Sequence, residues 1–542
     1  MNLTIRGLLL IALAWTQPVW ADLQYELQNI TEHMVLDGNG QLPSGGAVYQ
    51  PAIVEEFYYE LEYQPAWKSR EQAARVLGLL KGSYKDGLNP EDYHYSELMA
   101  LWAKRDTDWP ERERSRARFD VLLTDGVLLY IRHLLQGKVD PRQMDPNFNY
   151  SRMDFEPTSV SASLRKAIAE QKFASIVEQA RPSQAFYQQM KAALAHYRNL
   201  DATRQFVAIP TDIVLKPGQT HASVPLLRTR LAELGYSQPG GSVSRAYDPD
   251  LVAAVRQFQQ DHGLDADGVV GRQSYAFLNM TYKARVNSLR INMDRVRWLA
   301  QDITDDFIIV NIAGYEMYYI RGQELLWESP VMVGTIQHQT PIFTARLKYL
   351  EFNPIWTVPR SIIGRSLLPK FKANPQYVLD NNYHLYDRSG KQADPLKLDW
   401  ASYNINNFPF SVVQQPGEKN ALGRVKFIFP NRHAVYLHDT PARNLFSRSA
   451  RAFSSGCVRV KHPLEFAEVL LNDPQNWSLS QVEGLVASAK PQERVYLDRD
   501  VDVMLMYWTT SPTRDGKVQF HTDIYGKDPV AIAALKARPQ VM

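Results

Sequence analysis

The feature that most constrains the fold of this chain is a change in its hydrophobic period near residue 300. Upstream, stretches such as 71–88 and 118–139 repeat apolar residues every three or four positions, which is typical of amphipathic helices. Downstream, 306–335 alternates apolar and polar residues, which predicts consecutive strands joined by tight turns. We therefore expect a multidomain α+β protein: a helical scaffold over 22–205, a mostly-β domain over 300–500, and C-terminal strands with a tail over 501–542.

Residues 221–282 are predicted to form a separate three-helix unit between these regions. Its helices are marked by apolar positions on one face: Leu227, Leu231 and Leu234, then Val252, Val255 and Phe258, then Tyr275 and Leu278. The stretch FQQDHGLDADGVVG joins the last two helices. With that motif, the unit resembles the type 1 peptidoglycan-binding domain. The alternative is a generic helical spacer.

A long insertion interrupts the mostly-β domain. Residues 361–410 are rich in Asn, Tyr, Pro and Lys and lie between two strand-like stretches that begin at Ala345 and Gly423. A segment of this length is uncommon as a plain loop, which favours a functional lid. Trp356 stands on the strand before the lid, where it could line a cleft or pack in the core.

The N-terminus has the pattern of a secretory signal peptide. Arg6 precedes an apolar run from Leu8 to Trp15, and Val19 and Ala21 suit cleavage after Ala21. The alternative is an uncleaved anchor, for which the run is short. We therefore expect residues 1–21 to be removed and the mature chain to be exported.

Cys457 is the only cysteine of the chain, in the stretch SSGCVRV. A single thiol can be a small buried hydrophobe or a nucleophile. Exported proteins usually pair or lose their thiols, so one retained cysteine favours reactivity. Gly456 lets the backbone turn sharply beside the thiol, and amides at such turns can form an oxyanion hole.

A base for the thiol is available on the preceding strand. His438 alternates with Tyr436, so both side chains should share a face, whereas His433 lies on the other. Arg459 could hold a carboxylate or be a solvated cation. A zinc site on Cys457 and the histidines is a weak alternative, because CxxC and HxxxH spacings are missing. A papain-like hydrolase would usually place its cysteine before its histidine.

The stretch VYLHDTP followed by SSGCVRV resembles the catalytic signature of the YkuD-type L,D-transpeptidases. The order of helical scaffold, binding module and lidded mostly-β catalytic domain is similar to the large YcbB (LdtD) group. This resemblance implies that Cys457 is the nucleophile and His438 the general base and acid. It also implies an orienting role for the Asp439 backbone carbonyl, oxyanion donation by the Gly456 and Cys457 amides, and substrate contacts by Tyr436, Ser455, Arg459 and Trp356. Ser455 departs from the family pattern, which has His before Gly-Cys.

The resemblance further implies a reaction and a location. The expected activity is peptidoglycan cross-linking between diaminopimelate residues (3→3), by a cysteinyl thioester on tetrapeptide stems in the periplasm, with no cofactor and no metal. Such an enzyme would serve cell-wall biogenesis and cell shape, be a carbapenem target, and could work with other wall-synthesis enzymes. The mild net charge of +3 argues against nucleic acid, and any membrane association would be peripheral. An L,D-carboxypeptidase, a lipoprotein-anchoring transferase and a non-catalytic wall-binding scaffold remain alternatives.

Overall fold

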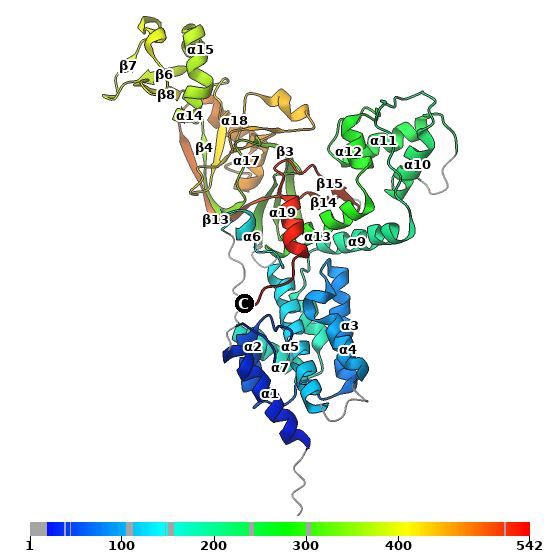
Figure 1. Ribbon diagram of the computed structural model, residues 1–542. Helices are drawn as coiled ribbons and strands as arrows, with labels where there is room; N and C mark the ends of the chain where they lie inside the picture. Colours follow the sequence, from blue (N-terminus) through cyan, green and yellow to red (C-terminus); the bar gives the residue numbers. More distant parts are fainter. Residues whose placement is uncertain are drawn as a thin grey trace, which may run out of the picture. The chain divides into compact units, whose positions relative to one another are not determined.

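The computed structural model describes residues 19–36, 39–43, 45–104, 112–146, 148–149, 157–237, 243–299, 305–322, 324–513 and 516–542. The chain divides into two compact units (Figure 1). One comprises Met1–Lys138, Arg152–Ser183 and Ala534–Met542; the other comprises Val139–Ser151 and Gln184–Ala533. Residues 1–18 of the predicted signal peptide (1–21) lie outside the described residues. No helix in the described ranges is long and apolar enough to cross a bilayer.

The first unit is built from helices. They are α1 (Val19–Leu36), α2 (Pro51–Tyr59), α3 (Arg70–Gly82), α4 (Tyr95–Lys104), α5 (Arg112–Gln136), α7 (Pro157–Ala169) and α8 (Phe173–Ala180), with short 3-10 turns η1 (Ser83–Asp86) and η2 (Pro90–Tyr93). Helix α5 is buried along much of its length, and two buried carboxylates tie other segments to it. Asp120 accepts hydrogen bonds from the Ala66 and Trp67 amides, and Asp125 accepts from the Tyr49 and Gln50 amides.

The predicted helical scaffold is longer than the first compact unit. We expected it to reach residue 205, but the compact unit stops at Ser183 and α9 (Ala185–Thr203) belongs to the second unit. The reason is its packing on α13 (Tyr282–Arg297), where Arg297 donates to the Tyr187 hydroxyl at 2.6 Å. The Phe186 ring also lies 5.8 Å from that of Trp508.

Three helices form the small module that precedes α13: α10 (Val224–Glu233), α11 (Pro249–Asp261) and α12 (Arg272–Leu278) (Figure 1). Buried Arg230 joins them to the preceding segment. Its guanidinium donates to the carbonyls of Leu278 and Val207, pairs with Glu233 at 3.1 Å, and lies 3.9 Å from the Phe206 ring. The buried guanidinium thus has two carbonyl acceptors and a carboxylate partner, as burial of a charge requires.

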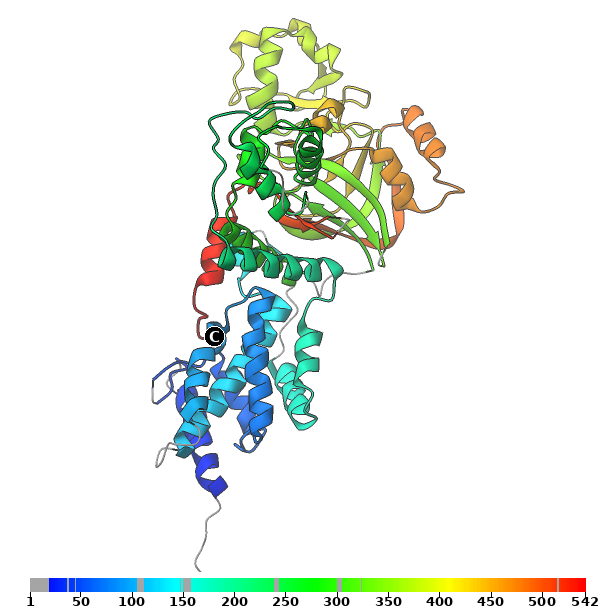
Figure 2. The same cartoon turned by 90° about the vertical axis from the view of Figure 1, so that its right-hand side faces the viewer.

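The mostly-β region is one nine-stranded sheet in the order β11-β3-β12-β10-β9-β4-β13-β1-β2. The strands are β1 (Asp306–Asn311), β2 (Glu316–Arg321), β3 (Glu324–Gly334), β4 (Phe343–Phe352), β9 (Val425–Ile428), β10 (Leu437–His438), β11 (Ala452–Ser454), β12 (Val458–Val460) and β13 (Glu493–Met506). Because β2 also pairs with β3, all strands except β11 close into a barrel, and Figure 2 shows the strong curvature. Helices α17 (Pro463–Leu471) and α18 (Leu479–Ala487) follow the nucleophile segment.

The boundary predicted at residue 500 falls within β13. β13 pairs with both β4 and β1, which makes it an inner strand of the sheet. The predicted tail is a short hairpin of β14 (Thr510–Pro512) and β15 (Val518–Phe520), followed by helix α19 (Asp528–Lys536).

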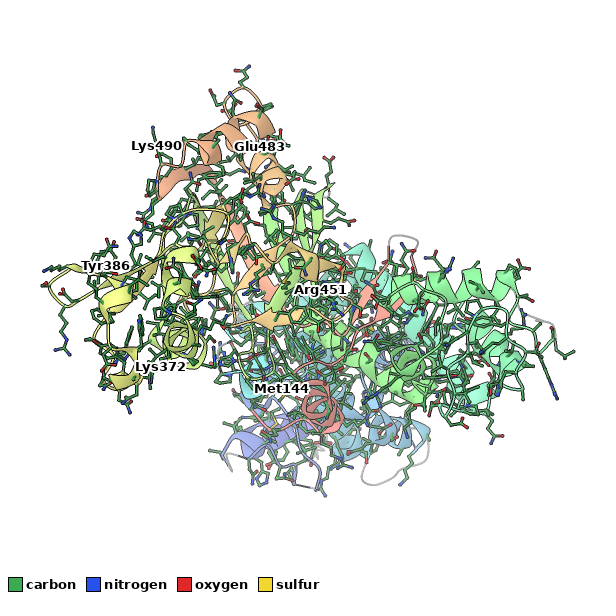
Figure 3. The ribbon with its side chains drawn as sticks, turned by 90° about the horizontal axis from the view of Figure 1, so that it is seen from above. Met144, Lys372, Tyr386, Arg451, Glu483 and Lys490 are labelled. Carbon is green, nitrogen blue, oxygen red and sulfur yellow. The ribbon has the colours of Figure 1, made fainter. Side chains whose placement is uncertain are left out.

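The insertion is a folded subdomain with its own core rather than an irregular loop. It contains β5 (Trp356–Thr357), α14 (Arg360–Ile362), the π-helical η3 (Ile363–Leu367), α15 (Leu368–Ala373), α16 (Gln376–Asp380), β6 (Tyr383–Tyr386), β7 (Gln392–Ala393), the 3-10 turns η4 (Pro395–Lys397) and η5 (Trp400–Ser402), and β8 (Ser411–Gln414). Because β5 pairs with β8, this lid spans 356–414, wider than the predicted 361–410. Figure 3 shows Lys372 and Tyr386 on the lid, apart from Arg451 beside β11.

Three buried histidines make the second unit sensitive to acid. Burial lowers the pKa of His262 and His438 to about 3 and that of His521 to about 4. In the unfolded chain each would titrate near 6.5. The unfolded state therefore binds more protons, so the stability these groups contribute is present above pH 6.5 and lost as the pH falls toward 4.

We expect the urea midpoint of tryptophan fluorescence to fall between pH 7 and 5.5, with roughly 1 kcal/mol lost for each of these histidines. His262→Phe should flatten this dependence. His196→Gln, which changes an exposed histidine, should leave it unchanged. An identical pH slope in His262→Phe and the unaltered chain would contradict the assignment.

Candidate active site

Two short parallel strands bring the predicted site residues together. β10 and β12 pair with Leu437 opposite Val458 and His438 opposite Arg459. Continuing this register by one residue sets Tyr436 opposite Cys457. Since side chains alternate along a strand, Tyr436 and His438 share one face, as do Cys457 and Arg459. The Tyr436 ring stands edge-on to the His438 imidazole with centroids 5.6 Å apart, as their alternation in the sequence predicts.

His438 is buried and held by the next residue's backbone. Its Nδ1 lies 2.5 Å from the Asp439 carbonyl oxygen, which accepts the Nδ1 proton, and the backbone of Leu422 also hydrogen-bonds to the ring. Burial lowers the pKa of His438 to about 3, and the Arg459 charge acts in the same direction. At neutral pH the imidazole is therefore uncharged and able to accept a proton.

The Cys457 thiol is half-buried and protonated at neutral pH. Burial raises its pKa above the ordinary 9.0, while hydrogen bonds from Tyr436 and the charges of Arg459 and Lys426 act in the opposite direction. Sγ contacts the Ala434 carbonyl at 3.8 Å and the amide and hydroxyl of Tyr436. In the described part of the chain, the thiol contacts Ala434 and Tyr436 and not the His438 imidazole.

Ser454 closes the turn that carries Cys457 and contacts the Gly456 amide. Its hydroxyl donates to the Cys457 carbonyl at 2.5 Å and accepts from the Gly456 amide at 3.0 Å. Gly456 has φ +119°, a conformation that other residues rarely adopt. The predicted oxyanion donor is thus already occupied by a side chain two residues away, and the Cys457 amide has no partner among the described contacts.

Two cations border the thiol. Arg459 is half-buried, and its Nε has no hydrogen-bond partner among the described residues. Lys426 lies opposite His438 on β9, 4.7 Å from the Tyr436 ring, and pairs with Glu351 at 3.3 Å. The sequence did not single out Lys426, because only the strand register brings it here.

The Asp439 side chain has a structural role. It is 1% exposed and accepts from the backbone amide and Nε of Arg424, at 3.0 and 2.9 Å, and from Arg443 at 3.4 Å. Gly423 has a positive φ, and a β-carbon there would collide with this carboxylate. A cavity of about 630 Å³ beside it is also lined by Arg424 and Arg443.

Ser455 is exposed and contacts the lid. Arg365 of η3 donates to its hydroxyl at 3.5 Å and also contacts Nε2 of His338, which lies in the loop between β3 and β4. Neither Arg365 nor His338 carries a family motif, so the sequence offered no signal for them.

Trp356 lies at the start of the lid, on β5. It pairs with Gln414 across β5 and β8 and packs against the lid core, which includes Val358, Phe371 and Trp400. No group of His, Cys, Asp and Glu suited to a metal ion occurs among the described residues.

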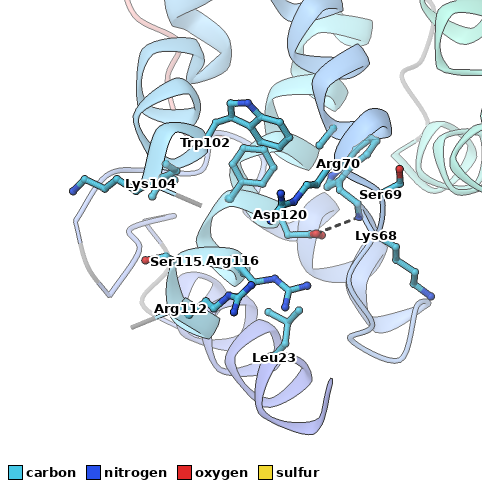
Figure 4. A pocket seen from close by; sticks show the side chains of 14 residues that line it. Leu23, Lys68, Ser69, Arg70, Trp102, Lys104, Arg112, Ser115, Arg116 and Asp120 are labelled. Carbon is cyan, nitrogen blue, oxygen red and sulfur yellow. Dashed lines mark hydrogen bonds between the residues drawn. The ribbon is translucent and has the colours of Figure 1, made fainter. Parts of the chain in front are cut away.

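The helical unit has a pocket of its own, of about 240 Å³ (Figure 4). Trp67, Trp102 and Phe119 line it together with several cations, and Asp120 lies in its wall. Burial raises the pKa of Asp120 to about 6, but its carboxylate is engaged by backbone amides and by Tyr58. The described lining of this pocket contains neither Cys nor His.

Comparison with known families matches residues 305–496 to the L,D-transpeptidase catalytic domain (YkuD), 220–278 to the "Putative peptidoglycan binding domain" and 52–194 to the "Scaffold domain". A Haemophilus influenzae protein named "Putative L,D-transpeptidase" is 37% identical over 253 residues, covering 46% of this chain. The chain spans about half of that relative's length, 49%.

Two solved structures are also similar. The L,D-transpeptidase (Yku) from Stackebrandtia nassauensis is 13% identical, with 55% of this chain and 97% of that chain covered and a TM-score of 0.20. The L,D-transpeptidase from Xylanimonas cellulosilytica is 14% identical, with 55% and 98% covered and a TM-score of 0.18. At these TM-scores neither likeness bears on the fold.

The ionisation of the site predicts how Cys457 reacts with an alkylating agent. Because thiol and imidazole are both neutral at pH 7, iodoacetamide should react slowly there and faster as the pH rises through and above 9, the ordinary value for a thiol. Tyr436→Phe should shift the profile to higher pH, since the thiolate loses a donor. An inflection near pH 6.5 would instead indicate a thiolate–imidazolium pair.

The two functions of Asp439 can be separated by substitution. Asp439→Asn should lower the free energy of unfolding by about 1–3 kcal/mol, because two arginines lose a buried charge. The alkylation profile of Cys457 should stay the same, since the backbone carbonyl that holds His438 is unchanged. A shifted profile with unaltered stability would assign the carboxylate to the base instead.

Proposed function

We propose that this chain, which carries a YkuD-type L,D-transpeptidase catalytic domain, is an exported peptidoglycan L,D-transpeptidase that works through a thioester on Cys457. The observation that carries the proposal is the pairing of β10 with β12. It places the only thiol of the chain opposite Tyr436, and two residues further along the chain lies His438, a buried imidazole whose Nδ1 is fixed by the Asp439 carbonyl.

The first half-reaction forms the thioester. Sγ of Cys457 attacks the carbonyl of the third residue, meso-diaminopimelate, of a donor tetrapeptide, while Nε2 of His438 takes the thiol proton. Tyr436, Lys426 and Arg459 stabilise the negative charge on sulfur during the attack. The Cys457 amide is the oxyanion donor in this scheme. The C–N bond then breaks, and the leaving D-Ala amine takes the proton from His438.

The second half-reaction transfers the acyl group. The neutral side-chain amine of diaminopimelate on a second stem attacks the thioester, and His438 accepts its proton. The C–S bond breaks and the proton returns to sulfur, which regenerates the thiol and leaves a 3→3 amide cross-link. The lid would limit access of water to the thioester.

Two further features support a cell-wall substrate. The three-helix module matches a peptidoglycan-binding family, and the N-terminal pattern suits export to the periplasm. Contacts with other wall-synthesis enzymes and a contribution to cell shape belong to the same proposal. A carbapenem, whose strained ring offers a carbonyl to the same thiol, should acylate Cys457.

The test uses the chain from Asp22 onward and purified disaccharide-tetrapeptide, with products identified by mass spectrometry. The unaltered chain should release D-Ala and form 3→3 dimers. Cys457→Ala should form none while keeping its circular dichroism spectrum, and His438→Ala should lose about 10²–10⁴-fold in rate.

Other products would redirect the proposal. Tripeptide without dimers would indicate water as acceptor, hence an L,D-carboxypeptidase, and transfer only to a protein amine would indicate lipoprotein anchoring. Dimers formed by Cys457→Ala would overturn it. A chain that neither turns over the stem nor gains the mass of a carbapenem at Cys457 would be a wall-binding scaffold.

A further inference from the structure

A lid arginine lies next to the nucleophile turn without a carboxylate partner. Arg365 donates to the Ser455 hydroxyl at 3.5 Å and contacts His338 Nε2. Its side chain is exposed, and no ion pair to it occurs among the described residues. Other arginines of the same region are engaged: Arg424 and Arg494 pair with carboxylates, and Arg360 donates to the carbonyls of Phe408 and Ile405.

The backbone on both sides of this contact is firmly held. In the lid, η3 is a π-helical segment, a form often found at functional sites. A β-carbon on Gly364 would lie 2.7 Å from Ile405, so the segment packs closely against the rest of the lid. Arg365 is therefore presented by a fixed backbone, although its own side chain reaches into solvent.

The loop that carries His338 is fixed to the nucleophile turn. Thr340 donates to the Gly456 carbonyl at 2.9 Å, and the Thr335 amide donates to the Ser454 carbonyl at 3.0 Å. His338 Nδ1 lies 3.3 Å from the Thr335 hydroxyl. Because Nε2 faces a guanidinium, it must be the acceptor of the ring, so Arg365 rests against two neutral acceptors, an imidazole and a hydroxyl.

Neutral acceptors are weak partners for a guanidinium compared with a carboxylate, which it can bind with two parallel hydrogen bonds. Under the proposed function, the donor peptide brings a carboxylate, that of its terminal D-Ala, close to the Arg365 guanidinium. In D-Ala one carbon separates the carboxylate from the scissile nitrogen. Ser455 is two residues from Cys457, so their Cα atoms are at most about 7 Å apart.

We propose that Arg365 binds the terminal carboxylate of the donor's leaving residue and so selects tetrapeptides with a free C-terminus. The carboxylate would displace Ser455 and His338 as its partners. Ser455, in the position where the family has histidine, and His338 then serve to hold the guanidinium near the scissile bond before substrate arrives. This inference rests on the proposed function.

The test compares two donors that differ only at the C-terminus: disaccharide-tetrapeptide ending in D-Ala and the same compound ending in D-alaninamide. The kcat/KM for release of D-Ala or D-alaninamide is measured for the full mature chain, Arg365→Gln, Arg365→Lys and Arg388→Gln. Arg388 is a matched control, an exposed arginine of the lid turn between β6 and β7.

The unaltered chain should prefer the free acid by about 10- to 100-fold, the range expected for a charge-assisted pair. Arg365→Gln should lose that preference by slowing only with the acid, mainly through KM, and should match the unaltered chain with the amide. Arg365→Lys should retain part of the preference, and Arg388→Gln all of it. Calorimetric binding of both donors to Cys457→Ala, with and without Arg365→Gln, should show the same selective loss without turnover.

Equal slowing of both donors by Arg365→Gln would make Arg365 a structural part of the lid and overturn the inference. An undiminished preference for the acid in that variant would overturn it as well. In either case the proposed function would stand, because the unaltered chain turns over its donor. Failure of the unaltered chain to form a thioester with either donor would instead overturn the proposed function, and this assignment with it.

Discussion

The site depends on the register between β10 and β12. Each strand contributes only two or three residues, yet their parallel pairing sets Leu437 against Val458 and His438 against Arg459. Shifting this register by one residue would send the side chains of one strand to the opposite face. The flanking antiparallel partners, β9 beside β10 and β3 beside β12, hold both short strands inside a closed barrel where such a slip would disrupt every neighbouring pair.

The same burial that fixes these residues also sets their ionisation. A buried imidazole and a half-buried thiol both favour their neutral forms, so charge separation at rest is disfavoured. Lys426 and Arg459 would help a thiolate but oppose an imidazolium. The arrangement therefore suits proton transfer that accompanies attack on a carbonyl, when charge passes from sulfur to the oxyanion, better than a standing ion pair.

Local patterns predicted much of the site, whereas contacts between distant segments could not be predicted. The alternation of Tyr436 and His438 and the glycine before Cys457 are properties of a few neighbouring residues, and the structure places them accordingly. The place of Trp356 in the lid follows from the pairing of β5 with β8, which local patterns do not show. The hydrogen bond from the Gly456 amide to the Ser454 hydroxyl was not predicted, because sequence patterns do not show which acceptor a turn amide meets. The assignment of α9 to the second unit also rests on distant contacts, because α9 has ordinary helical periodicity and packs on α13.

The lid has a core of its own, so its internal packing does not depend on the barrel. Val358, Phe371, Leu385, Trp400 and Val412 are buried together within it. Its two ends are bracketed by buried Asn420, which donates to the carbonyls of Pro354 and Gln415 at 3.0 Å. A subdomain with a packed core and bracketed ends keeps its internal geometry, because distorting it would expose apolar surface. A residue on such a body can be aimed at a reacting bond with a precision that an irregular loop of the same length would not provide.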